Sequence, residues 1–204
     1  MLTIVEVDLA TLTDPVLRAP TYRCVDRRIW VGVKHASLYG AIRATALAFS
    51  ARYLVADATG VGAGLVSFLT HALGAARVIP FVFNSASKSK LGWDFLGICE
   101  AGRYLEWKAD AGSWKLDTAS DVQSVFWREL EFCQYEVIPG PGQQLRWGVP
   151  NGTRDPATGE RVHDDTVLSA ALAAVLEGLP WAADTGPGTL LRAADPLDEM
   201  DRGF

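Results

Sequence analysis

The chain has 204 residues, of which 49% are hydrophobic and 21% are charged. This composition excludes a disordered polypeptide, and the length suits one globular domain that can bury a sizeable core. No apolar run reaches the roughly eighteen residues needed to cross a bilayer, so no membrane association is expected. Residues 1–6 predict a strand rather than a signal peptide, since they lack a basic first segment.

Three cysteines, Cys24, Cys99 and Cys133, are widely spaced and form no CxxC pair. They indicate neither a zinc site nor a disulfide framework, and they favour a reducing cytoplasm. The net charge of −5 counts mildly against nucleic-acid binding, which usually requires a basic excess. It does not exclude a nuclease, because such an enzyme concentrates carboxylates around its metals.

The first half of the chain alternates strand and helix patterns. Apolar, β-branched runs predict strands at 2–7 and 22–33, with a proline-containing loop between them at 11–20. An alanine-rich helix is expected at 37–51. The continuous apolar run at 52–57 predicts a buried strand covered by helices. A glycine-rich turn at 60–64 leads into a helix, and 77–84 predicts another strand, in which Pro80 favours an edge or a bulge.

The second half predicts a polar stretch, helices, a hairpin and a closing helix. In order, these are the stretch 85–89, a helix at 90–101, a short strand at 104–107, a loop at 109–119, a helix capped by Asp121 that runs to about 133, two strands around the PGPG turn within 136–147, a mobile loop at 151–160, and a helix from 164 to about 177. This order predicts a mixed α/β sheet with helices on both faces. One domain spans 1–180, and 181–204 is expected to be a loosely ordered tail.

Asp57 ends a buried strand and is followed by the small residues of ATGVG. In open α/β sheets, ligands lie beyond the carboxyl ends of strands, and glycines leave room for a ligand or metal. The alternative is an aspartate that only caps the next helix. A phosphate-binding loop is disfavoured, because the segment does not match GxxxxGK[ST].

His163, Asp164 and Asp165 stand together at the start of the closing helix. They could simply cap that helix and complement its dipole, although one aspartate would suffice. Asp164 shares the apolar stripe of the helix, where an unpaired carboxylate is costly unless it meets a cation. Asp165 lies to the side and could reach the same ion.

Together the two groups predict a metal centre. Mg²⁺ or Mn²⁺ takes oxygen ligands from separate elements, and two such ions about 3.5–4 Å apart support phosphodiester cleavage. We therefore expect Asp57 to approach Asp164 and Asp165, with water as the nucleophile and His163 as a further assisting group.

At these residues the chain resembles the C-terminal nuclease domain of phage terminase large subunits. The matching segments are LVADATGVGAG (54–64), VIPFVF (78–83), SKSKLGWDFL (87–96), and HDD (163–165) leading into SAALA (169–173). The resemblance covers about residues 20–177. It implies an RNase H-like fold and a metal-dependent endonuclease of double-stranded DNA that works in the host-cell cytoplasm with an ATPase motor domain, a small terminase subunit and a portal. Asp57, Asp164 and Asp165 would hold the metals.

The chain also departs from this family. The family carries another essential aspartate on a strand that precedes the strand pair seen here, and no phosphate loop of the motor half occurs. The resemblance therefore implies a fragment, a split gene or a decayed gene. Asp8 or Glu6 could replace the lost aspartate, or could be ordinary strand-end residues.

Lys88 and Lys90, in the polar stretch, could contact the DNA backbone or lie in a solvated loop. Two other functions stay open beside the terminase nuclease. One is an inactive remnant that keeps the fold without a complete metal site. The other is an RNase H-like enzyme of resolvase or integrase type, which fold alone cannot separate.

Overall fold

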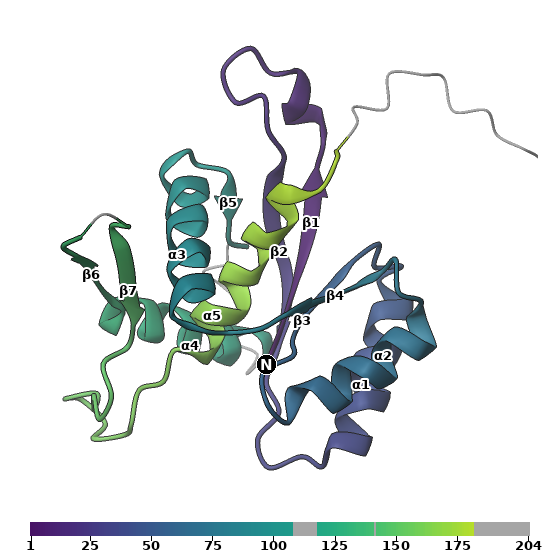
Figure 1. Ribbon diagram of the computed structural model, residues 1–204. Coiled ribbons are helices and arrows are strands. Elements are labelled where there is room, and N and C mark those ends of the chain that lie inside the picture. Colours follow the sequence, from purple (N-terminus) through teal and green to yellow (C-terminus); the bar gives the residue numbers. More distant parts are fainter. Residues whose placement is uncertain (108–117, 141, 182–204) are drawn as a thin grey trace, which may run out of the picture.

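The computed structural model describes residues 1–107, 118–140 and 142–181, with the backbone alone for 118–121 (Figure 1). It contains both helices and strands, so the mixed α/β character predicted from the sequence is confirmed. In chain order the elements are β1 (Leu2–Asp8), η1 (Ala10–Thr13), β2 (Thr21–Arg28), α1 (His35–Ala48), β3 (Leu54–Asp57), α2 (Gly62–Leu73), β4 (Val78–Phe81), α3 (Ser85–Glu100), β5 (Tyr104–Leu105), α4 (Thr118–Phe132), β6 (Gln134–Ile138), β7 (Gln144–Gly148), α5 (Asp165–Ala171) and η2 (Leu172–Gly178), where η marks 3-10 helices.

The strands of the described residues fall into three sheets rather than the one sheet that the sequence predicts. β1 pairs with β2 in antiparallel fashion, and β5 joins β2 in parallel. β3 and β4 form a separate parallel pair, and β6 and β7 form a hairpin. No backbone pairing joins β1 to β3, which is the reason that a single sheet does not form.

Two apolar clusters hold these parts together. The larger one surrounds Tyr22, Phe95 and Phe126. It includes residues of α5 and η2, which together form the closing helical segment and cross in front of β1 and β2 in Figure 1. The smaller one packs α1 and α2 against β3 and β4, around Ile42 and Leu69. Helices thus cover β3 from two sides, as expected for a strand in an α/β layer.

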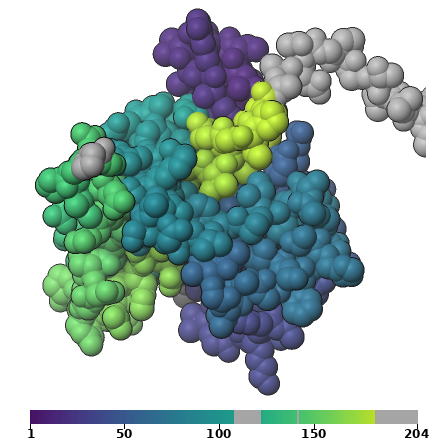
Figure 2. Space-filling view, viewed as in Figure 1, coloured from purple at the N-terminus to yellow at the C-terminus, as the bar shows by residue number. Residues whose placement is uncertain are grey.

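The closing helical segment is tied to the β1–β2 sheet by polar contacts as well. Glu177 of η2 accepts hydrogen bonds from the hydroxyl of Tyr22 at 2.6 Å and from Arg103 Nη2 at 2.8 Å. Burial alone would raise the pKa of Glu177, but these donors and the charge of Arg103 hold it below its usual value. In the space-filling view, this part of the chain fills the surface between α3 and the tip of the β1–β2 hairpin (Figure 2).

The expected polar stretch at 85–89 is wrong, because α3 already begins at Ser85. Asn84 starts the helix with a capping box: its side chain accepts from the amides of Ala86 and Ser87, and Ser87 Oγ accepts from the Asn84 amide. These side chains satisfy amides that a helix start leaves unpaired. Lys88 and Lys90 therefore lie on a helix rather than in a loop.

Most other elements lie where the sequence predicts them, with shifts at the ends. The second strand stops at Arg28, the first helix begins at His35, and the last helix changes to 3-10 geometry at Leu172. Among the described residues, β4 pairs only with β3, so the edge position indicated by Pro80 is confirmed.

The interpretation of β3 as a fully buried strand is wrong. Leu54, Val55 and Ala56 are half-buried, and Asp57 is exposed. An isolated antiparallel bridge between Arg154 and Arg161 joins the expected loop 151–160 to the residue that follows it. In the described parts of the chain, no helix has the length and apolar character to cross a membrane. The tail expected at 182–204 lies outside the described residues.

Candidate functional site

Asp57 stands at the carboxyl end of β3, at the start of a tight loop. Its Oδ1 accepts a hydrogen bond from the Thr59 amide at 2.8 Å. Thr59 Oγ1 in turn accepts from the Phe83 amide, which fastens the loop to the segment after β4. The carboxyl group is thus held on a short, internally bonded turn.

The start of α2 lies directly against Asp57. A Cβ atom at Gly62 would stand 2.4 Å from the carbonyl oxygen of Asp57, whereas one at Gly64 would meet nothing within 4 Å. Gly60 has a φ of 54°, in the left-handed region that glycine adopts without strain. The glycines of this turn therefore let the helix begin immediately behind the aspartate.

Asp164 is directed toward α3. Its Oδ2 lies 3.4 Å from Lys88 Nζ, and that ammonium group also lies 5.5 Å from the ring centre of Trp147. At Gly148, whose φ is 125°, a Cβ would stand 2.3 Å from Asp164 Oδ2. The half-buried aspartate therefore meets a cation, as the sequence demands, but that cation is a lysine side chain.

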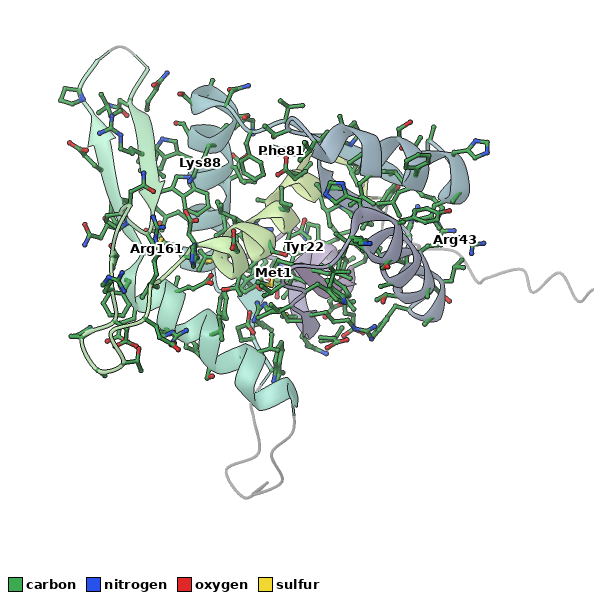
Figure 3. All side chains as sticks on the ribbon, turned by 90° about the horizontal axis from the view of Figure 1, so that it is seen from below. Met1, Tyr22, Arg43, Phe81, Lys88 and Arg161 are labelled. Atoms are coloured by element: carbon green, nitrogen blue, oxygen red, sulfur yellow. The ribbon has the colours of Figure 1, made fainter. Side chains whose placement is uncertain are left out.

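Asp165, the next residue, faces another region. It is exposed and lines a cleft of about 760 Å³ that Asp57 also lines. The amino group of Met1 lies close enough to feel the charge of Asp165: burial lowers the pKa of this amino group, and Asp165 opposes the shift. In Figure 3, Met1 and Lys88 lie on opposite sides of the closing helix, consistent with the divergence of the two aspartates.

The start of α5 is anchored by Glu129 of α4, a residue that the sequence analysis missed. Glu129 is 4% exposed, and its Oε2 accepts from the amide of Thr166 at 2.7 Å and also from the Thr166 hydroxyl. Burial raises the pKa of Glu129 despite these donors. Glu129 thus positions the helix start that carries Asp164 and Asp165. A signal was present in the sequence, because this glutamate follows the apolar Phe126 by three residues on one helix face.

A hydrogen bond and an electrostatic interaction give the direction of β1 relative to the closing helix. Thr3 Oγ1 donates to Ser169 Oγ at 2.9 Å, and Met1 lies near Asp165. β1 therefore begins beside the start of α5.

A third contact fixes the direction of β3. Tyr53, just before β3, packs edge-on against Trp181, just beyond η2, with ring centres 5.7 Å apart. Because α5 and η2 run from Asp165 toward Trp181, β3 begins at the far end of this segment. β1 and β3 thus run in opposite directions, and Asp57, at the end of β3, lies toward the end of the cleft that carries Asp165.

The structure therefore brings Asp57 and Asp165 to one cleft and places Asp164 on the other flank of α5. Within the described ranges, no group of three or more histidine, cysteine, aspartate or glutamate side chains has the arrangement of a metal site. Two carboxylates and water could still hold one hard cation, since Mg²⁺ commonly binds through one or two carboxylates and keeps several waters.

The remaining predicted residues lie outside this cleft. Lys90 is largely exposed and paired with Asp94 one helical turn away. Glu6 pairs with Arg23 at 3.2 Å, and Asp8 accepts from the Ala10 amide at the far end of β1. Neither Glu6 nor Asp8 lines the cleft, which argues against both as substitutes for the family's first-strand aspartate. His163 is exposed.

Comparison of the chain with protein-family models, with curated proteins and with solved structures finds no match in any of the three.

Proposed function

We propose that this chain is an RNase H-like, metal-dependent endonuclease domain of the kind found in phage DNA-packaging terminases. The observation that carries this proposal is the placement of Asp57 and Asp165 on one cleft, from a strand end and a distant helix start. Carboxylates at the carboxyl ends of parallel strands are well placed for chemistry in α/β proteins. The partners would be double-stranded DNA, an ATPase motor, a small subunit and a portal.

The residues of the cleft fit a hard divalent cation in part. Asp57 and Asp165 supply oxygen donors and negative charge, which is what Mg²⁺ or Mn²⁺ requires. When bound, such an ion polarises the phosphoryl group and lowers the pKa of water. A pair of ions would call for more carboxylates than these two, so this cleft supports one ion.

On the other flank, Asp164 holds Lys88 half-buried beside Trp147. Lys88 is a positioned cation, whereas Lys90 reaches solvent with 77% of its side chain exposed. We propose that both lysines contact the phosphate backbone of DNA, which positions the duplex without reading its sequence. Lys88 would have to release or share its contact with Asp164 to do so.

Nicking of a supercoiled plasmid with Mn²⁺ tests the proposal. Asp57→Asn and Asp165→Asn should each lower the rate at least 100-fold, because a neutral amide is a poor ligand for a hard cation. Glu136→Gln is the control: this exposed carboxylate pairs with Arg146 in the β6–β7 hairpin, outside the cleft, and its loss should leave the rate unchanged. Equal rates for Asp57→Asn and the wild type would refute the assignment.

The main alternative is an inactive domain that keeps the fold. The observation favouring it is that only two carboxylates among the described residues, Asp57 and Asp165, line the cleft. In that case no cleavage would occur at any Mn²⁺ or Mg²⁺ concentration. A resolvase or integrase type of enzyme would instead show a preference for branched DNA over linear duplex.

A further inference from the structure

The connection between β1 and β2, residues 9–20, projects from the body of the molecule (Figure 1, Figure 2). Its shape is set by its own hydrogen bonds. Thr11 Oγ1 donates to the carbonyl oxygen of Ala19 at 2.7 Å, and Asp14 Oδ1 accepts from the amide of Val16 at 2.8 Å. We call residues 9–20 the tip. The tip therefore has a defined surface that another molecule can meet without reordering it.

The tip presents an apolar side chain between two opposite charges. Val16 is 85% exposed, and it lies between Asp14 and Arg18 in the sequence. The amides of Leu17 and Val16 hold the pKa of Asp14 below its usual value. Among the residues that the structure describes, neither Asp14 nor Arg18 takes part in an ion pair. A surface that matches the tip is thus apolar and carries one base and one acid.

A groove with this character lies between α3 and η2. It has a volume of about 740 Å³. Its apolar lining includes Phe81, Leu91, Val175 and the exposed indole of Trp93. A cavity of about 150 Å³ is enough to hold benzene, so the groove has room for several side chains.

The groove also carries the two charges that the tip requires. Lys90 and Asp94 of α3 line it and pair with each other, with 77% and 33% of their side chains exposed. An acid beside Lys90 and a base beside Asp94 would extend this pair to a row of four alternating charges. Asp14 and Arg18 of a second copy supply that acid and that base. Charges arranged in this way favour the correct partner and register over others.

The position of the groove suits a reciprocal contact between two copies. Arg103 lines the groove, and its Nη1 donates to the carbonyl oxygen of Pro20, where the tip ends, at 2.9 Å. The groove thus lies beside the base of the projection, and no residue of the tip lines it. Two copies that lie side by side in opposite directions would each place a tip beside the groove of the other. This exchange has twofold symmetry, the commonest symmetry of homo-oligomers.

We propose that the chain forms a twofold-symmetric dimer in which the tip of each copy docks in the groove between α3 and η2 of the other. Val16 enters the apolar part of the groove, Asp14 pairs with Lys90, and Arg18 pairs with Asp94. Lys90 is also one of the two lysines proposed to contact DNA, so the dimer and DNA would compete for this side chain. The dimer itself does not depend on nuclease activity.

Sedimentation velocity of the full chain over a range of concentrations tests the proposal. The wild type should change from monomer to dimer as concentration rises and should go no further. Val16→Asp places a charge in the apolar groove, and Gly97→Trp fills the groove from α3. A Cβ atom at Gly97 would meet nothing within 4 Å, so the chain can accept this side chain. Each change should weaken dimer formation about tenfold or more, as the loss of a central contact does.

A mixture of the two variants separates this contact from any other. Val16→Asp keeps an intact groove, and Gly97→Trp keeps an intact tip. One of the two contacts can therefore form again between unlike chains, and the mixture should contain more dimer than either variant alone at the same total concentration. A mixture with no more dimer than its components would overturn the proposal.

Two matched controls lie outside the tip and the groove. Val31→Asp changes a valine that is 87% exposed, and Gly40→Trp changes an exposed helical glycine with open space around its missing side chain. Both should form dimers as the wild type does. A wild type that stays monomeric at every concentration would refute the dimer. So would dimer formation that appears only after deletion of residues 182–204, because that segment would then be the occupant of the groove.

Discussion

Two glycines of α2 differ in what lies beyond their missing side chains. Gly62→Ala would press a methyl group against the Asp57 carbonyl, 2.4 Å away, while Gly64→Ala would meet open space. We expect Gly62→Ala to cost about 1–3 kcal/mol of unfolding free energy, as overpacking does. Gly64→Ala should instead stabilise the chain by up to about 1 kcal/mol, because alanine favours a helix.

Urea denaturation of both variants measures this difference. A Gly62→Ala chain as stable as Gly64→Ala would show that the start of α2 does not lie against Asp57. Because the clash involves the backbone of Asp57 itself, Gly62→Ala should also disturb the position of the carboxyl group. Glycine at position 62 is therefore needed to keep the Asp57 carboxyl group in its place in the candidate site.

The adjacent aspartates of α5 differ in function because a helix turns by about 100° per residue. Asp164 faces Lys88 and Gly148 on one flank, and Asp165 faces the cleft on the other. The sequence showed that a carboxylate on the buried stripe needs a cation, but not which cation. Lys88 is distant in sequence and belongs to a helix whose start was misplaced, so its pairing with Asp164 could not be predicted.

At the scale of elements, α5 depends on α4 through Glu129. Burial raises the pKa of this carboxyl group above its ordinary value of about 4.5. The folded chain therefore holds this proton more tightly than the unfolded chain does. As pH rises from about 4.5 through the raised pKa, folding loses stability relative to a variant that cannot ionise there.

We thus expect the free energy of unfolding of the wild type, minus that of Glu129→Gln, to fall as pH rises across this window and then to level off. Urea denaturation between about pH 4 and 8 gives this difference. Glu136→Gln, at a glutamate with 66% of its side chain exposed, is the control and should show no such trend. A difference that grows with pH would contradict the assignment, since it would mean that the ionised form stabilises the fold.

The order of elements was largely predictable from the sequence, whereas the environment of some elements was not. The run that forms β3 reads as an inner strand because valine, leucine and alanine are continuous there. Among the residues that the structure describes, β3 has a partner on one edge only, and Leu54, Val55 and Ala56 are half-buried. The apolar pattern of a strand indicates that it suits an inner position in a sheet. It does not indicate whether another strand pairs with it on each side. Similarly, the sequence does not identify Asn84 as a helix cap, because the polar residues of 85–89 also suit a loop.

At the scale of the whole molecule, the candidate site depends on the closing helical segment. The closing helical segment brings the start of β1, the end of β3 and Asp165 to one place, although they are far apart in the chain. Among the described residues, Asp57 and Asp165 are the two carboxylates that line this cleft.

Metal binding can be measured without cleavage, through thermal stability. A ligand that binds only the folded chain stabilises it by about 2.7 kcal/mol at 100 times its Kd, and each kcal/mol shifts Tm by roughly 2–4 °C at this size. Saturating Mn²⁺ should therefore raise the Tm of the wild type by about 5–10 °C. Asp57→Asn and Asp165→Asn should abolish the shift, because both residues line the cleft. Asp164→Asn should retain it, since this carboxylate faces Lys88.

A shift of Tm that survives Asp165→Asn but disappears with Asp164→Asn would mean that the ion lies on the Lys88 flank of α5. The assignment of the metal site to this cleft would then be wrong.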